Sequence, residues 1–137
     1  MDTTVSTDSS LKPSGKVSSA LRLQQVLQGI IALFFTAAGL ANLAGGMGAD
    51  MLRLGYPEYF SMIIGGGYLI GVVCIYQRVF PFLQDWAFGA MAASLVGAAA
   101  SHIFVGDPLS KVLPCFIIQI LFVWSYVLRM KGQADVA

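Results

Sequence analysis

Four long apolar runs, none of which contains Asp, Glu, Lys or Arg, constrain this chain more than any other feature. Each approaches or reaches the roughly 20 residues that an α-helix needs to cross about 30 Å of hydrocarbon. Because lipid offers no water to backbone groups, each run must satisfy its own hydrogen bonds, which favours helices. The runs also lack the alternation of a transmembrane β-strand. The four runs are Val26–Leu43, Tyr59–Tyr76, Trp86–Phe104 and Val112–Leu128.

The composition is typical of a membrane protein. The chain is 57% hydrophobic and 11% charged, whereas a soluble domain carries roughly 25% charged residues. The connections between the runs are short, which makes successive helices antiparallel neighbours. The sequence therefore predicts an all-α membrane protein, a four-transmembrane-helix antiparallel bundle in contact with the lipid bilayer.

The two ends of the chain are more polar than its middle. Residues 1–22 are rich in Ser and Thr and hold Pro13 and Gly15, which predicts a disordered polar tail. We expect residues 23–128 to form the transmembrane domain and residues 129–137 a C-terminal tail. A secretory signal peptide is disfavoured, because the first apolar run follows about 25 mostly polar residues and no clean A-x-A site comes after it.

Lys and Arg residues predict the orientation, because they favour the cytoplasmic side of a membrane. Six of the 8 lie in the two tails and the second connection, whereas the first and third connections hold only Arg53 and Lys111. We therefore expect a multi-pass protein with both termini cytoplasmic. The polar residues expected at the opposite, outer end are Tyr56, Glu58, His102 and Asp107.

The third run carries two parallel rows of small residues, spaced by four. Small residues at this spacing let membrane helices approach closely, which predicts that these rows form the packed face of the helix. His102 continues one row and should lie in the bundle interior near the outer boundary. The rows are Gly89, Ala93, Gly97, Ser101 and Ala90, Ser94, Ala98, His102.

Other apolar runs also hold residues that need an explanation. Three adjacent glycines, Gly65–Gly67, cost a helix roughly 1 kcal/mol each relative to alanine. Close packing is the favoured compensation, and a ligand cavity beside Tyr68 is the alternative.

Asn42 and Gln119 lie inside apolar runs, where they either form hydrogen bonds between helices, each worth about 1 kcal/mol, or line a pocket.

Several kinds of chemistry are disfavoured. The predicted depths of Cys74 and Cys115 differ by about 12 residues, or ~18 Å, whereas a disulfide needs Cα atoms within about 7 Å. With one histidine and no clustered carboxylates, neither a metal nor a haem cofactor is expected. No run holds the carboxylate that proton-coupled transport uses. A net charge of +1 without a basic stripe argues against nucleic acid.

His102 and Asp107 are the candidate catalytic residues, in the stretch SHIFVGDP. Histidine serves as a general acid or base near neutral pH, and a nearby carboxylate orients its ring. Two structural alternatives stay open: an interhelical hydrogen bond for His102, and a helix cap or loop turn for Asp107. The candidate ligand-binding residues are Asn42, Tyr56, Tyr68, Ser101 and Gln119.

Four stretches carry a family resemblance: FFTAAGLANL, LGYPEYF, IIGGGYLIG and SHIFVGDPL, all between Leu23 and Leu128. In their order and spacing the chain resembles the DoxX-like family of small four-helix membrane proteins. The resemblance implies a membrane subunit of the oxidoreductase type, since some relatives are linked to quinone-coupled sulfur oxidation or to redox complexes. Two positions depart from the family pattern, because Asn42 stands where a lysine is frequent and Tyr68 where a glutamate is.

Three functions are compatible with these features. The first is a redox-associated subunit that binds a quinone or another lipophilic aromatic compound in the outer half of the bundle, through His102, Asn42 and Tyr68. The second is a cofactor-independent isomerase or cyclase, in which His102 and Asp107 transfer a proton on a hydrophobic metabolite. The third is a non-catalytic scaffold that packs through its glycine faces. A homodimer or a membrane redox partner is compatible with the first and third.

Overall fold

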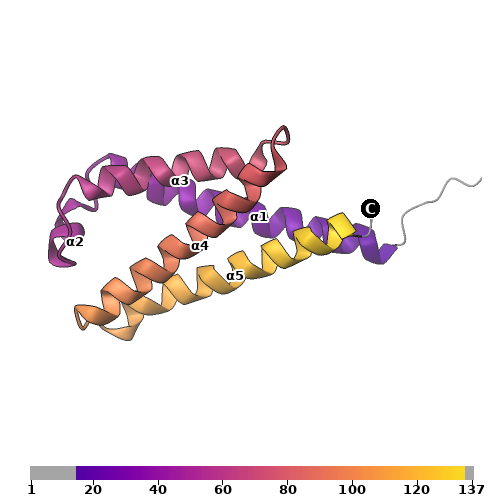
Figure 1. The fold of residues 1–137 in the computed structure, drawn as a ribbon. Coiled ribbons are helices and arrows are strands. Elements are labelled where there is room, and N and C mark those ends of the chain that lie inside the picture. The colour runs from indigo at the N-terminus through magenta and orange to yellow at the C-terminus, as the bar shows by residue number, and fades with distance from the viewer. Residues whose placement is uncertain (1–14, 135–137) are drawn as a thin grey trace, which may run out of the picture.

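The protein is a bundle of four long helices with one short helix between the first two (Figure 1). This computed structural model describes residues 15–134. The long helices alternate in direction, so the start of the first and the end of the last lie together at one end of the bundle, here called the termini end (Figure 1). The opposite end is called the α2 end. The helices are α1 (Gly15–Leu43), α2 (Gly48–Arg53), α3 (Phe60–Tyr76), α4 (Pro81–Phe104) and α5 (Leu109–Ala134).

The predicted membrane bundle is confirmed. Three helices are long and apolar enough to cross a bilayer, over Ser19–Leu43, Pro81–Phe104 and Leu109–Gly132. The fourth, α3, is apolar but has 17 residues, which span about 26 Å. All four predicted runs lie within these helices or differ from them by one residue. The sequence did not predict α2, which lies in the glycine-rich first connection.

The long helices extend further toward the termini end than the apolar runs do. Helix α1 begins at Gly15, so residues 15–22 of the expected polar tail are helical, and α5 continues to Ala134. The remainder of the expected tails, residues 1–14 and 135–137, lies outside the described residues.

Each long helix packs against two others: α1 and α4 both contact α3 and α5. Backbones approach most closely where α1 crosses α3. A Cβ atom added to Gly65 would lie 2.7 Å from the carbonyl oxygen of Gly39 and 2.9 Å from the Cβ atom of Asn42. A Cβ atom at Gly71 would lie 2.6 Å from the sulfur of Met91 on α4. The favoured interpretation of the three adjacent glycines as close-packing residues therefore holds at Gly65 but is wrong at Gly66 and Gly67, where an added Cβ atom meets nothing within 4 Å.

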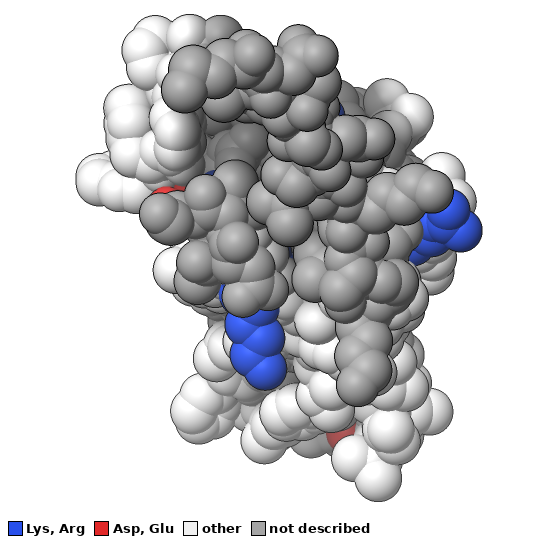
Figure 2. Space-filling view, turned by 90° about the vertical axis from the view of Figure 1, so that its right-hand side faces the viewer, with Lys and Arg blue, Asp and Glu red and all other residues white. Residues whose placement is uncertain are grey.

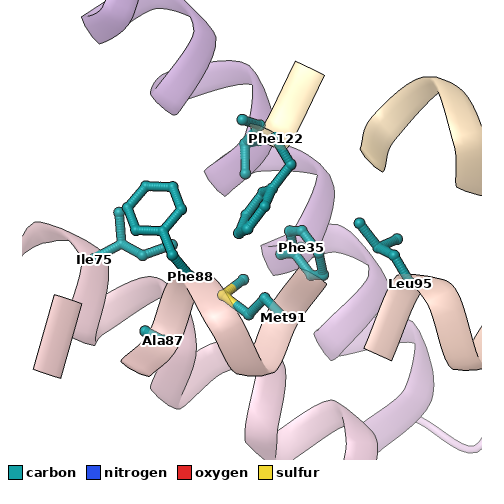
Figure 3. Packing of buried hydrophobic residues seen from close by; sticks show 8 residues of the cluster. Phe35, Ile75, Ala87, Phe88, Met91, Leu95 and Phe122 are labelled. Carbon is teal, nitrogen blue, oxygen red and sulfur yellow. The ribbon is translucent and has the colours of Figure 1, made fainter. Parts of the chain in front are cut away.

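The interior of the bundle is filled by large side chains. Phe35 of α1 is fully buried, and its ring meets the rings of Tyr68 and Phe122 edge-on, with centroids 4.8 Å and 5.8 Å away. Figure 3 shows this cluster, in which Phe88 and Met91 of α4 point toward Phe122 and Phe35. The buried cluster comprises Ile31, Phe35, Ile75, Ala87, Phe88, Met91, Leu95 and Phe122.

The prediction for the packed face of α4 is wrong. Its buried face consists of Ala87, Phe88, Met91, Leu95 and Ala99, and the rows of small residues lie beside it. Around a Cβ atom added to Gly89 or Gly97, no atom lies within 4 Å. The physical reason is volume: a ring of four helices leaves a central space that large side chains must fill, and dispersion contacts reward that filling.

Candidate functional site

Five polar residues meet at the α2 end of the bundle and are called here the α2-end cluster: Arg53, Tyr56, Ser101, His102 and Asp107. The carboxylate of Asp107 contacts two partners, because its Oδ2 lies 2.6 Å from Nδ1 of His102 and its Oδ1 accepts a hydrogen bond of 2.5 Å from Arg53. The hydroxyls of Tyr56 and Ser101 lie 2.9 Å apart. The cluster thus connects α2 and the residues after it to the end of α4.

Local backbone geometry brings His102 and Asp107 together. Helix α4 ends in a Schellman motif, in which Gly106 has a φ of +76° and its N–H donates to the carbonyl of Ile103, while the N–H of Asp107 donates to the carbonyl of His102. Only glycine adopts this left-handed conformation without strain. The reversal places the Asp107 side chain beside the ring of His102, one turn back along the helix.

Helix α2 ends in the same way. Gly55 has a φ of +87°, its N–H donates to the carbonyl of Leu52, and the N–H of Tyr56 donates to that of Met51. The chain turns back over the end of α2, and the ring of Tyr56 stacks on Phe60 with centroids 5.0 Å apart. Both glycines are followed by a cluster residue and a proline, in LGYP and VGDP.

The electrostatics of the cluster keep Asp107 ionised. The hydrogen bond from Arg53, and to a smaller extent the one from His102, lowers the pKa of Asp107 from 3.8 to about 2. Both donors favour the charged form of the carboxyl group. The same hydrogen bond raises the pKa of Arg53. Asp107 therefore lies in a loop turn, one of the two alternatives for this residue, but its carboxyl oxygens bind Arg53 and His102.

The contact with Asp107 fixes the orientation of the His102 ring. The His102 side chain is 19% exposed, and its Nε2 has no hydrogen-bond partner among residues 15–134. An imidazole held by a carboxylate through Nδ1 has its other nitrogen available to exchange a proton. The cluster is thus chemically equipped for acid–base work at the α2 end.

A separate apolar cavity of about 330 Å³ lies between α3 and α4. Of the predicted ligand-binding residues, Tyr68 lines it. Tyr68, Cys74, Trp86 and Ser94 are the lining residues that carry polar side-chain groups, and the Ser94 hydroxyl donates to the carbonyl of Met91. The lining residues are Ile64, Gly67, Tyr68, Ile70, Gly71, Cys74, Leu83, Trp86, Ala87, Ala90, Met91 and Ser94.

Two other predicted residues lie elsewhere. Asn42 is buried at the crossing of α1 and α3, where its Nδ2 donates to the carbonyl of Ala38 at 2.8 Å. Gln119 lines a smaller cavity of about 190 Å³ between α4 and α5, together with Cys115. The side-chain oxygens of Asn42 and Gln119 are buried, and neither has a hydrogen-bond partner in the described part of the chain.

The structure thus brings four predicted residues together at the α2 end, Tyr56, Ser101, His102 and Asp107, and leaves Asn42, Tyr68 and Gln119 in three other places. Sequence reasoning missed Arg53 as a member of the cluster. Its position three residues before Tyr56, in the connection between the first two long helices, was the available indication. Cys74 and Cys115 are free thiols, and no group of three potential metal ligands occurs within residues 15–134.

Comparison with known protein families matches residues 26–125 to the DoxX-like family. That match covers the greater part of all four long helices and includes the cluster residues Arg53 to Asp107. Among curated proteins and solved structures, no match to the chain is found.

Proposed function

This chain belongs to the DoxX-like family of integral membrane proteins, and we propose that it binds a lipophilic small molecule, aromatic or quinone-like, in the cavity between α3 and α4. The observation that carries the proposal is the cavity itself. Its volume of about 330 Å³ is in the range of small-molecule sites, which are mostly apolar with a few polar groups that orient the ligand.

The walls of the cavity suit a flat ring that arrives from the lipid. Trp86 and Ile70 line it and are 76% and 66% exposed on the surface of the bundle, so a ligand dissolved in the bilayer has a lateral route to it. Gly67 contributes no side chain, and a Cβ atom added there meets nothing within 4 Å. The hydroxyl of Tyr68 supplies a hydrogen-bonding group.

The face of α4 that lines this cavity leads to the α2-end cluster. Ala90 and Ser94 line the cavity, and Ala98 and His102 continue the same row. Eight residues of helix place His102 about 12 Å beyond Ser94. A compound with its ring in the cavity and a polar group extended along this row would reach Nε2 of His102. One ligand would then contact both the cavity between α3 and α4 and the α2-end cluster.

The first test fills the cavity without touching the core. The Gly67→Leu variant would place a side chain in the open space, whereas Gly66→Leu, one residue away, does not line the cavity and also has open space around it. Protein purified in mild detergent is extracted, and the small molecules are identified by mass spectrometry. We expect wild type and Gly66→Leu to retain an aromatic compound that Gly67→Leu loses; bulk lipid alone in all three contradicts the proposal.

A second candidate, proton transfer on the bound metabolite by an isomerase or cyclase, is favoured by the 2.6 Å contact of His102 with Asp107. Here His102 would act as the acid or base, and Asp107 would orient it. The His102→Gln variant keeps the approximate size of the side chain and removes the imidazole, so we expect turnover of the extracted compound to fall about 10²- to 10⁴-fold. Unchanged thermal unfolding of the variant is the control, and full activity contradicts this function.

A further inference from the structure

A second polar region lies at the termini end, far from the α2-end cluster. A cavity of about 400 Å³ opens there between all four long helices, here called the termini-end cavity. Its lining is unusual for a membrane bundle because it is dominated by carboxamides and guanidinium groups. The residues with polar side chains that line it are Gln24, Gln25, Gln28, Tyr76, Arg78, Gln84 and Arg129.

The depth of the termini-end cavity corresponds to the head-group region of a bilayer. Arg129 follows Leu109, the first residue of α5, by twenty positions, which is about 30 Å of helix and close to the thickness of the hydrocarbon layer. Figure 2 looks onto this end and shows blue atoms of Lys and Arg reaching the surface on both sides of the view. In a bilayer spanned by α5, the lipid phosphates would lie close to the level of Arg129.

Arg129 is held in place before any ligand arrives. Its side chain is only 9% exposed, and its guanidinium donates to Asp85 at 2.5 Å and to Gln84 at 2.6 Å. The same group lies over the rings of Phe88 and Tyr126, 5.7 Å and 6.0 Å from their centroids. A guanidinium that is already oriented loses little conformational entropy when it binds an anion.

The charges around the cavity do not cancel. Two guanidinium groups, Arg78 and Arg129, line it, and the carboxylate of Asp85 neutralises one of them. Arg78 is exposed and, within residues 15–134, has no carboxylate within 4.0 Å. Nε2 of Gln24 donates to Oε1 of Gln28 at 2.6 Å, and Nε2 of Gln28 donates to the carbonyl of Ile75 at 3.4 Å, so each amide nitrogen keeps a second N–H. The site therefore offers one unpaired positive charge and several neutral donors.

We propose that the termini-end cavity binds a phosphate-bearing anion, either the head group of an anionic phospholipid or a small phosphate ester from the aqueous phase. Arginine binds phosphate oxygens with paired N–H donors, and the glutamine amides would donate to the remaining oxygens or to a glycerol hydroxyl. Basic pockets between helices at the membrane surface are suited to acidic lipid head groups. This site is independent of the α3–α4 cavity and extends beyond the proposed function.

The test measures lipid retention by the full chain in a neutral detergent. Native mass spectrometry compares dioleoylphosphatidylglycerol with dioleoylphosphatidylcholine, which carries the same phosphate but no net charge. We expect wild type to retain the anionic lipid preferentially and Arg78→Gln to weaken that retention roughly fivefold. Arg22→Gln is the matched control, because Arg22 is exposed on α1 at the same end but does not line the cavity. Asp85→Asn, which removes the carboxylate that pairs with Arg129, should strengthen retention.

Competition with inorganic phosphate separates the two sources. If millimolar phosphate displaces the lipid from wild type but not from Arg78→Gln, the site serves a soluble phosphate ester; if the lipid stays bound, the site serves a lipid head group. Equal retention of the two lipids by wild type, or equal behaviour of Arg78→Gln and Arg22→Gln, overturns the proposal.

Discussion

Asp107 holds the α2-end cluster together, because its two carboxyl oxygens bind side chains from two different helices. Arg53 of α2 and His102 of α4 donate to it, and Lys111 of α5 adds a favourable charge, so its pKa falls from 3.8 to about 2. A carboxyl group whose pKa is lower in the folded state adds stability that is complete above its unfolded pKa and is lost as the pH falls through its folded pKa. We therefore expect this contribution to persist above about pH 4 and to disappear toward about pH 2.

Thermal unfolding in a neutral detergent between pH 2 and pH 6 measures this effect. Asp107→Asn removes the titrating group, so its unfolding temperature should decrease less on acidification than that of the wild type. Asp50→Asn is the matched control, since Asp50 also contacts Arg53, at 3.4 Å, but is far more exposed. An identical pH dependence for wild type and Asp107→Asn would mean that the contacts of Asp107 add no stability.

At the scale of helices, α2 and α4 end in the same backbone motif. In each case the motif places one residue of the α2-end cluster. In both, a glycine in the left-handed conformation is followed by a cluster residue and then by proline. The glycine reverses the chain, the next residue is carried back over the helix end, and proline prevents the helix from continuing. The pair LGYP and VGDP in the sequence therefore contains the information that brings Tyr56 and Asp107 to the cluster.

The crossing of α1 and α3 leads to a sharp prediction about two neighbouring glycines. A methyl group at Gly65 would lie 2.7 Å from a carbonyl oxygen of α1, whereas one at Gly66 meets nothing within 4 Å. Gly65→Ala must push the helices apart, and we expect it to lower the free energy of unfolding by about 1–3 kcal/mol. Gly66→Ala should be neutral or raise it by up to about 1 kcal/mol, because alanine favours the helix.

Unfolding of both variants in mixed micelles, monitored by circular dichroism, provides the comparison. The two substitutions add the same methyl group to the same helix, so a general effect of alanine in α3 cancels between them. Equal stability of Gly65→Ala and Gly66→Ala would show that α1 and α3 are not in tight contact at this crossing.

For the whole molecule, the sequence was sufficient to predict the four long helices but not which face of each helix packs inward. Runs without charge specify helices in lipid regardless of their partners, which is why all four were predictable. Which face packs inward depends on the volume that four helices leave between them, and spacing alone favoured the small row through Ser94 over the row of Phe88 and Met91. Cavities follow from the same three-dimensional packing. The cluster was partly predictable because His102 and Asp107 are close in sequence, whereas Arg53 joins it from another connection.

The orientation of the whole molecule in the membrane is the remaining prediction. The start of α1 and the end of α5 lie together at the termini end (Figure 1), and the segments at that end hold Lys16, Arg22, Arg78, Arg129 and Lys131. Because such residues resist transfer across the membrane, we expect the termini end to face the cytoplasm and the α2-end cluster to face outward.

Two single cysteines in a background of Cys74→Ser and Cys115→Ser measure this orientation. Ser110 is exposed at the α2 end and Lys131 at the termini end. A membrane-impermeant maleimide added to intact cells should modify the Ser110→Cys variant at once and the Lys131→Cys variant only after permeabilisation. The reverse pattern would place His102 on the cytoplasmic side and the termini-end cavity in the outer leaflet. The ligands available to both sites would change accordingly, since any aqueous compound would then reach each site from the other compartment.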